Sequence, residues 1–382
     1  MQPIEEIYLD HVSSTPVHPE IIRAMDELLP IHYANSDALH SAGTKIQQLM
    51  QRSRSAIAAA FGVSADEVVF TSGATEANNA LIKGIAMANL HKGKHVITSP
   101  IEHASVYGSF EWLESQLGFE VTYLPVDADG RVRVEDLKDA LRKDTILVSI
   151  MAVNNEIGTI LPISDYAKIV KENSRAYFHA DCVQALGKIP LSLENIDAAS
   201  FSAHKINGLK GSGIQILRKN VPYVAYISGG QQENGMRGGT PNALANILFA
   251  KTLRLALEGQ VAHQKHCEML KQRLIQKLSN IDAIVINSPS EACSSFILNI
   301  SCLSVPSEVM MNWLNAQKIY LSAQSTCSSK TRQYSHTLTA LGLTGQRLTG
   351  SLRIGLGASN TVDEIDRFVS VLQEGIQTYG KL

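Results

Sequence analysis

Between residues 67 and 181 the sequence alternates between short apolar runs and longer stretches with helical spacing. The runs have the length and residue types of buried strands, and they cover residues 67–70, 95–98, 121–124, 146–150 and 177–180. Strands that alternate with helices form βαβ units, in which the strands are parallel and helices cover both faces of the sheet. The pattern therefore predicts an α/β fold built on a mostly parallel sheet.

The pattern changes after Pro241. We expect a long helix over residues 242–278, then strands at 283–286, 295–300 and 351–355 and a helix at 308–314. Thr361 and Glu364 have the spacing of a capping box that opens a last helix. These elements predict a smaller α+β domain of residues 1–15 and 251–382, beside a large domain of residues 16–250.

The composition limits the classes of function. The 382 residues are 45% hydrophobic and carry a net charge of −2, which gives no electrostatic reason to expect nucleic acid or membrane binding. No apolar run is long enough to span a bilayer, and the N-terminus lacks the features of a signal peptide. The five cysteines are scattered and never in CxxC spacing, which argues against disulfides and a metal site and favours the reducing cytoplasm.

The turn Ser72-Gly73-Ala74-Thr75 joins an expected strand to an expected helix. Ala74 and Thr75 would present N–H groups and a hydroxyl to an anion such as a phosphate, although a plain helix cap explains these residues equally well. No Gly-Lys-[Ser/Thr] follows the turn, so it is not a Walker A loop. No G-x-G-x-x-G motif follows any strand, which weakens the case for a dinucleotide.

Lys205 stands just after another short apolar run, residues 198–202, and before a glycine-rich turn. Most lysines reach solvent, but burial at a strand end lowers the pKa of a lysine and makes it a usable amine nucleophile. Ligands of open α/β sheets bind at the carboxyl ends of the strands. Lys205, Ser202 and His204 would lie there.

Four more polar residues follow expected strands, namely His103, Asn155, Asp181 and Gln184. Each has an ordinary explanation, since an aspartate at a strand end often caps a helix and a lone histidine is usually structural. As parts of a ligand site, Asp181 would keep a pyridine nitrogen protonated and Gln184 would donate to a ring oxygen. Asn155 would bind that oxygen or a substrate carboxylate, and His103 would stack on the ring.

These positions together are consistent with a pyridoxal phosphate site. Lys205 would form the Schiff base, and Asp181 would make the ring an electron sink. Thr75, Ser202 and His204 would hold the phosphate.

Seven motifs carry a resemblance to one known family. They are Tyr-Leu-Asp-(x)4-Thr-Pro at residues 8–16, Gly-Ala-Thr-Glu-Ala-Asn-Asn at 73–79, Glu-His-Ala at 102–104, Asn-Asn-Glu-Ile-Gly at 154–158, His-Ala-Asp-Cys-Val-Gln at 179–184, Ala-His-Lys at 203–205 and Gly-Met-Arg-Gly-Gly-Thr at 235–240. Over nearly its whole length the chain resembles the NifS/IscS-type cysteine desulfurases. The resemblance implies the fold-type I fold of pyridoxal phosphate-dependent transferases, which is similar to aspartate aminotransferase.

The resemblance also implies roles for the site residues. Lys205 would carry the cofactor, His103 would stack on its ring, and Asp181 would pair with the pyridine nitrogen. Gln184 and Asn155 would surround the phenolic oxygen.

Two further residues gain a role only through the resemblance. Thr240 would reach the phosphate of the neighbouring subunit, so the active unit would be a homodimer. Arg353 would bind the carboxylate of the substrate, which suits a bidentate guanidinium. The sequence departs from the usual family pattern at residues 11–14, 231–234 and 332–335, which bears on the sulfur acceptor and the rate.

Cys327 differs from the other cysteines because its neighbours are polar. The family places its nucleophilic cysteine in a Ser-x-Cys-x-Ser loop, which Ser325-Thr326-Cys327-Ser328-Ser329 matches. A thiol on an exposed loop can attack the substrate sulfur and leave as a persulfide, so we expect residues 322–333 to be the most mobile internal segment. The remaining cysteines are expected to be apolar fillers: Cys182, Cys267, Cys293 and Cys302.

The sequence therefore predicts a cysteine desulfurase that converts L-cysteine to L-alanine. The resemblance implies that its persulfide sulfur passes to an acceptor protein, but the sequence does not name it: an iron–sulfur scaffold, a tRNA-thiolation enzyme and a dedicated carrier are all open. A selenocysteine lyase or a class V aminotransferase is the alternative within the same fold, and Cys327 argues against the aminotransferase. A non-catalytic scaffold that binds a sulfur-carrier partner is the alternative from another class, and Lys205, Asp181 and His103 argue against it.

Overall fold

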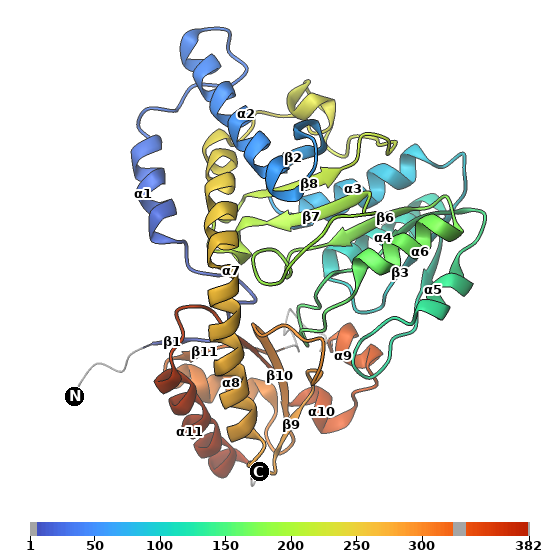
Figure 1. Ribbon diagram of the computed structural model, residues 1–382. Coiled ribbons are helices and arrows are strands. Elements are labelled where there is room, and N and C mark those ends of the chain that lie inside the picture. Colours follow the sequence, from blue (N-terminus) through green and yellow to red (C-terminus); the bar gives the residue numbers. More distant parts are fainter. Residues whose placement is uncertain (1–5, 324–333, 381–382) are drawn as a thin grey trace.

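The computed structural model describes residues 6–323 and 334–380, and a seven-stranded sheet forms its centre (Figure 1). The sheet has the order β2-β8-β7-β6-β5-β3-β4. Its strands are β2 (Val68–Thr71), β3 (His95–Thr98), β4 (Glu120–Tyr123), β5 (Thr145–Ser149), β6 (Tyr177–Asp181), β7 (Ala198–Ser202) and β8 (Gly213–Leu217). Strands β3 to β7 are parallel, whereas β8 runs antiparallel to β2 and β7. The predicted α/β fold with a mostly parallel sheet is confirmed, and β8 is a strand that the prediction lacks.

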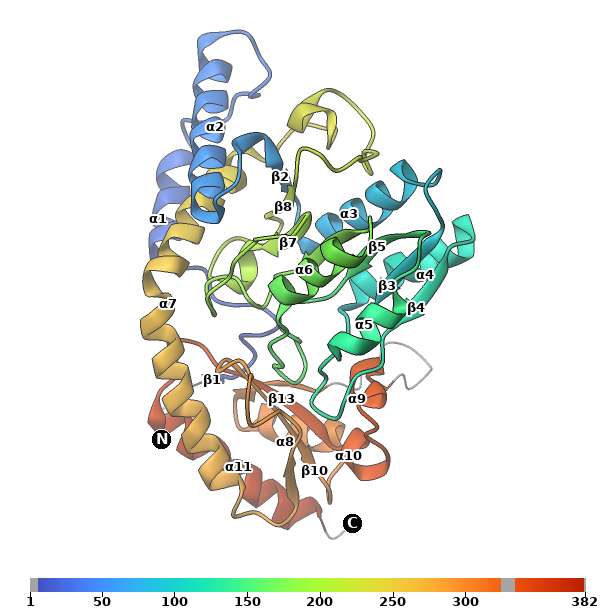
Figure 2. The same ribbon diagram turned by 45° about the vertical axis from the view of Figure 1, so that its right-hand side comes forward.

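Helices cover both faces of this sheet because successive residues of a strand point to opposite sides. Val96 packs in an apolar cluster with residues of α3 and α4, whereas Ile97 packs in a second cluster with residues of α5 and α6. Figure 2 shows these two pairs of helices on opposite sides of the strands. Their bounds are Ala74–Ala88 for α3, Ala104–Leu117 for α4, Val134–Ala140 for α5 and Ile163–Asn173 for α6.

A second, antiparallel sheet has the order β12-β13-β10-β9 and lies below the first in Figure 1. Its strands are β9 (Ile284–Ile286), β10 (Ile297–Cys302), β12 (Ser322–Ala323) and β13 (Ser351–Gly355). The helices of this part are α8 (Ser307–Ala316), α9 (His336–Ala340), α10 (Gly345–Thr349) and α11 (Val362–Tyr379), the last of which opens with the predicted capping box. The N-terminal strand β1 (Ile7–Tyr8) pairs in parallel with β11 (Ile319–Tyr320). Residues 322 and 323, expected in the cysteine loop, are therefore part of a sheet.

The long helix α7 (Ala243–Leu278) runs beside both sheets. It packs on α1 (Pro19–Leu28) and α2 (Ser41–Phe61) in the upper part of Figure 1 and on α11 in the lower part. The boundary expected at residue 250 falls inside this continuous helix, and the division into two domains stays a prediction. Short 3-10 turns complete the elements at η1 (Ala65–Glu67), η2 (Ala203–Lys205) and η3 (Gln232–Gly235).

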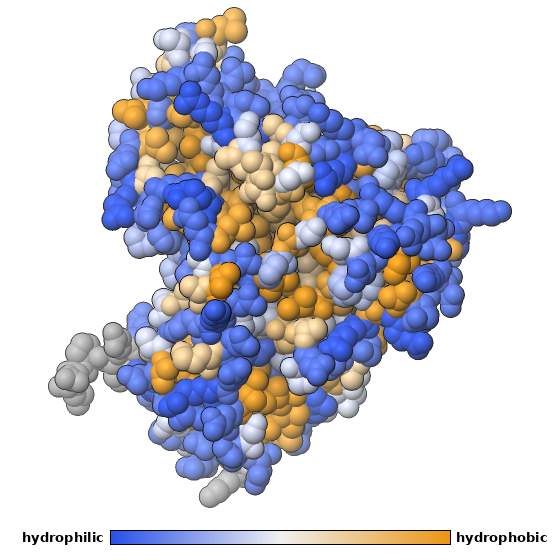
Figure 3. Space-filling model, in the orientation of Figure 1, coloured by the Kyte–Doolittle hydropathy of each residue, from blue (hydrophilic) through white to orange (hydrophobic). Residues whose placement is uncertain are grey.

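The surface in Figure 3 is largely hydrophilic and is hollowed on its left side, between the upper and lower parts. Every helix within the described residues falls short of the length and apolar character that crossing a membrane requires.

Candidate active site

A cavity of about 630 Å³ lies at the carboxyl ends of the parallel strands β3, β5, β6 and β7. Most of the residues predicted to form the site line this one cavity: Ala74, Thr75, His103, Asn155, Asp181, Gln184, Ser202, His204, Lys205 and Arg353. The topology explains the gathering, since parallel strands all end at the same edge of the sheet. Arg353 comes from β13 of the other sheet.

The turn before α3 is shaped to receive an anion. Gly73 is the N-cap residue, with φ +150°, and none of the described side chains caps the helix N-terminus. A Cβ on Gly213 would lie 2.6 Å from the Cα of Gly73, which is too close for any side chain. Only a glycine at position 213 therefore lets β8 come this near to the turn. The first N–H groups of α3 therefore stay available beside Thr75 and His204, which is an arrangement that binds phosphate.

Asp181 is the last residue of β6 and is 5% exposed. Its Oδ2 accepts a hydrogen bond from Asn78 Nδ2 at 2.8 Å, and its Oδ1 accepts one from the backbone N–H of Val183 at 3.0 Å. These two donors fix the carboxylate at the edge of the cavity. A carboxylate held in this way can keep a ring nitrogen protonated.

Asn78 also links Asp181 to His103. Its Nδ2 donates to Ser105 Oγ at 2.9 Å, and Ser105 Oγ lies 2.8 Å from His103 Nδ1. Burial lowers the pKa of His103 and favours the neutral ring. Asn78 has no role in the sequence prediction, although it lies in the 73–79 motif, four residues after Ala74 and hence on the same face of the helix.

Lys205 ends the turn that follows β7, and its Nζ donates to the carbonyl groups of Val12 at 2.6 Å and Ser13 at 2.7 Å. Burial, with a smaller effect from Arg353, lowers the pKa of this amine to about 8. The direction is the one expected for a lysine at the end of a core strand. Near neutral pH a useful fraction of the amine is therefore unprotonated and nucleophilic.

Arg353 is 7% exposed and lies where the N-terminal segment crosses from one sheet to the other. Its guanidinium donates to Ser13 Oγ at 2.6 Å and to the Asn155 carbonyl at 3.0 Å. One of its amino groups, Nη2, lies 3.4 Å from Asp10 Oδ1. The Arg353 Nε is buried and has no hydrogen-bond partner within residues 6–323 and 334–380, so among the described groups it can still donate to an acceptor such as a substrate carboxylate.

The hydrogen bonds of the Gln184 side chain differ from the expected one to a ring oxygen. Its Nε2 donates to the Val12 carbonyl at 3.1 Å, and its Oε1 accepts from Lys188 Nζ at 2.6 Å. Asn155 lines the cavity, and the hydrogen bond that it forms with Arg353 uses its backbone carbonyl. The roles of both side chains toward a ring oxygen stay predictions.

Comparison with known proteins decides the family, because residues 7–368 match the family Aminotransferase class-V. The chain belongs to the class V aminotransferase family. The cysteine desulfurase IscS of Methanosarcina thermophila is 40% identical to the chain over 374 residues, which make up 97% of this chain and 92% of that protein.

Two solved structures extend this comparison. A NifS-like protein is 36% identical, with a TM-score of 0.92 over 98% of this chain and 100% of that one. SspA in complex with cysteine is 32% identical, with a TM-score of 0.79 over 93% of this chain and 100% of that one. The resemblance to NifS/IscS-type proteins and the fold-type I architecture are confirmed.

Class V aminotransferases use pyridoxal phosphate, and the cavity of this family member fits that group. The uncapped N-terminus of α3 suits its phosphate. The fixed carboxylate of Asp181 suits its ring nitrogen, and the Lys205 amine with its lowered pKa suits its aldehyde.

Thr240 does not line this cavity. It lines a smaller one of about 170 Å³, and Ser72 and Gly211 line both cavities. The segment before it is fixed by Glu233, whose carboxylate accepts two hydrogen bonds from Arg54 at 2.7 and 2.8 Å. The segment 231–234, which departs from the family pattern, is therefore held in place by a buried ion pair of Glu233 with Arg54.

Cys327 lies outside the described residues, as does the rest of the segment 324–333. Among the cysteines that the structure describes, Cys182, Cys267 and Cys302 are buried and Cys293 is partly exposed. Burial raises the pKa of Cys182 and raises that of Cys267 to about 12, so these two thiols remain protonated and poorly nucleophilic.

Proposed function

We propose that this chain is a pyridoxal phosphate-dependent cysteine desulfurase that converts L-cysteine to L-alanine and leaves a persulfide on Cys327. One observation carries the proposal: a single cavity combines the low-pKa amine of Lys205, the fixed carboxylate of Asp181 and the guanidinium of Arg353, whose Nε has no partner among the described residues. The relatives named cysteine desulfurase and the cysteine complex of SspA support L-cysteine as the amino acid.

Bound pyridoxal phosphate supplies an electron sink that stabilises negative charge at the substrate Cα. The residues of the chain bind and orient around that chemistry. Arg353 binds the substrate carboxylate, Asp181 keeps the ring nitrogen protonated, and the N-terminus of α3 holds the phosphate. Lys205 holds the cofactor and then moves the proton at Cα.

The sulfur transfer needs a second nucleophile. The Cys327 thiolate attacks the substrate sulfur, the Cβ–S bond breaks and an S–S bond forms. The carbon that loses sulfur gains a proton, so L-cysteine and one thiol give L-alanine and one persulfide with no external oxidant. The persulfide then passes to an acceptor protein, either an iron–sulfur scaffold or a tRNA-thiolation enzyme.

The active unit in this proposal is a homodimer in the cytoplasm. Thr240 is offset from the cavity of its own subunit and would serve the phosphate of the second one. Exposed apolar side chains on α1 and the segment that follows it are available for such a contact: Ile22, Leu29, Ile31, Tyr33 and Leu39. The free thiols of the described cysteines suit a reducing compartment.

The test is the product balance of the purified protein with L-cysteine as the sole substrate. We expect alanine and protein-bound sulfur in equal amounts, without a keto acid. Alanine formation that requires a keto acid would identify an aminotransferase, and turnover of selenocysteine alone would identify a lyase. A protein that binds no pyridoxal phosphate would be the scaffold.

A further inference from the structure

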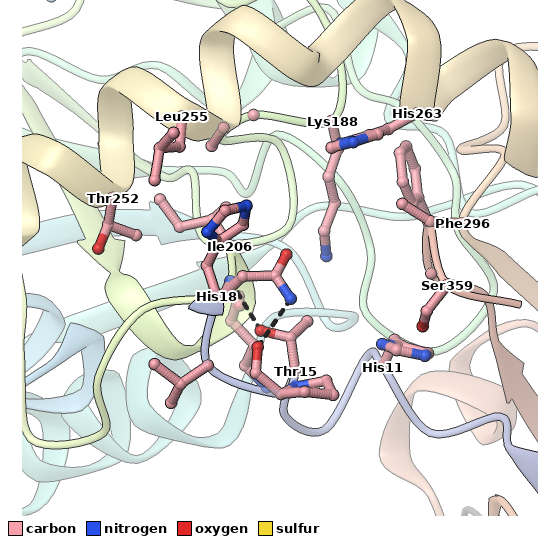
Figure 4. A pocket seen from close by; sticks show the side chains of 18 of the residues that line it. His11, Thr15, His18, Lys188, Ile206, Thr252, Leu255, His263, Phe296 and Ser359 are labelled. Carbon is pink, nitrogen blue, oxygen red and sulfur yellow. Dashed lines mark hydrogen bonds between the residues drawn. The ribbon is translucent and has the colours of Figure 1, made fainter. Parts of the chain in front are cut away.

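Lys188 is a buried lysine outside the predicted site. It is 6% exposed and lines a second cavity of about 410 Å³, which shares Lys205 with the cofactor cavity. Figure 4 shows its amine pointing into this second cavity, and Nζ lies 5.9 Å from the centre of the Phe296 ring. Lys188 therefore lines a cavity that adjoins the cofactor cavity at Lys205.

Lys188 has no counter-ion in the part of the chain that the structure describes. Within residues 6–323 and 334–380 it forms no ion pair, and the lining of the second cavity contains no aspartate or glutamate. Burial lowers its pKa to about 7. Burying such a group is costly unless it is hydrogen-bonded to a defined partner.

The partner is Gln184, whose Oε1 accepts from Lys188 Nζ at 2.6 Å. Because the Lys188 amine donates to the oxygen of the amide, the Nε2 group of Gln184 points the other way. That nitrogen donates to the Val12 carbonyl at 3.1 Å and carries a second N–H. Gln184 also lines the cofactor cavity, where the second N–H has no acceptor of its own among the described side chains.

We propose that Lys188 is a positioning residue, whose amine holds Gln184 Oε1 so that an N–H of Gln184 faces the phenolic oxygen of the cofactor. The inference rests on the cofactor site of the proposed function. An N–H donor at that oxygen stabilises its ionised form and so raises the affinity for the cofactor and alters its visible absorption. Without Lys188 the buried amide oxygen loses its donor, and the amide can rotate.

The test is a double-mutant cycle read by cofactor binding rather than by turnover. Apoprotein of the wild type, Lys188→Met, Gln184→Ala and the double variant is titrated with pyridoxal phosphate, and the visible absorption is recorded at saturation. Each single variant should bind about tenfold more weakly, the cost of one lost hydrogen bond. The double variant should be no weaker than Gln184→Ala, because both changes remove the same interaction.

Lys271→Met is the matched control. Lys271 is 8% exposed and donates to Cys293 Sγ at 3.0 Å and to the Ser294 carbonyl at 2.8 Å, away from the cofactor cavity. Its loss should leave cofactor affinity and absorption unchanged. Should Lys188→Met not fold, as judged by thermal unfolding, the smaller and uncharged Lys188→Gln takes its place in the cycle.

Two outcomes would overturn the positioning role. One is a Lys188 variant that binds pyridoxal phosphate as the wild type does, with the same absorption. The other is a double variant whose loss equals the product of the two single losses. Wild-type apoprotein that fails to bind pyridoxal phosphate would instead refute the proposed function, so the two failures are distinct.

Discussion

The Lys205 amine donates to the Val12 carbonyl at 2.6 Å, so the N-terminal segment holds the reactive group of the large sheet. The same segment holds Arg353 of the small sheet, through Ser13 Oγ at 2.6 Å. The cofactor-binding group and the group for the substrate carboxylate are thus positioned by adjacent residues. Attachment of the cofactor requires Lys205 to leave these carbonyl groups, and its protonation state decides how readily it reacts.

We expect covalent attachment of pyridoxal phosphate to the apoprotein to accelerate as the pH rises through about 8, the pKa of Lys205. Only the unprotonated amine attacks the aldehyde, so the rate should fall about tenfold for each pH unit below that value and level off above it. Stopped-flow absorbance measures this rate. A midpoint near the usual lysine pKa would contradict the lowered value, and a Lys205→Ala variant that still turns over would contradict the assignment itself.

Arg353→Lys should weaken the use of L-cysteine strongly. Lysine keeps the charge but loses the guanidinium Nε, which is buried and has no partner in the described part of the chain. The loss of a charge-assisted hydrogen bond corresponds to a fall of about 10- to 100-fold in kcat/KM. Cofactor binding should stay near that of the wild type, and equal kinetics for wild type and variant would exclude Arg353 from substrate binding.

Asn78→Ala should weaken cofactor binding although Asn78 is not predicted to touch the cofactor. Its side chain donates to Asp181 and to Ser105. Its removal therefore leaves the Asp181 carboxylate and the Ser105 hydroxyl, which contacts His103, without this donor. A cost of about 1–3 kcal/mol in unfolding free energy is expected for the buried groups that lose a partner. Asn79→Ala is the matched control, because Asn79 is only partly buried and its Nδ2 donates to the Thr75 carbonyl, one turn earlier in the same helix. Equal effects of the two substitutions would remove Asn78 from the site.

The site residues at the strand ends could be predicted from the sequence, whereas the contacts that other segments make with them could not. Asp181 and Lys205 follow apolar runs, and parallel strands bring such residues to one edge of a sheet. Val12 contributes its backbone carbonyl to the site, not its side chain. The direction of a carbonyl group cannot be predicted from a pattern of residue types. Asn78 resembles any polar residue of a helix until Asp181 is found beside it. The orientation of the Gln184 side chain could not be predicted either, because it depends on a hydrogen bond from Lys188, four residues further along the chain.

Thr240→Ala should weaken retention of the cofactor without changing the fold. Thr240 lies in a cavity separate from that of Lys205, and the proposed dimer would bring it to the phosphate of the second subunit. One lost hydrogen bond to a charged group corresponds to about a tenfold or greater rise in the dissociation constant of pyridoxal phosphate. Light scattering of the wild type should show a dimer, and a fully active monomer would exclude this role for Thr240.

Cys327→Ser should abolish the release of alanine while leaving cofactor binding intact. The sulfur transfer needs a thiolate, and burial keeps Cys182 and Cys267 protonated, so neither can replace Cys327. Removing a nucleophile from a coupled catalytic unit lowers kcat by several orders of magnitude. Cys293→Ser is the control, because Cys293 is the partly exposed cysteine among those that the structure describes. Mass spectrometry after treatment with L-cysteine should locate the added sulfur on Cys327. Sulfur found on Cys293, or a Cys327→Ser variant with near-normal activity, would refute the mechanism and leave the fold and the cofactor site standing.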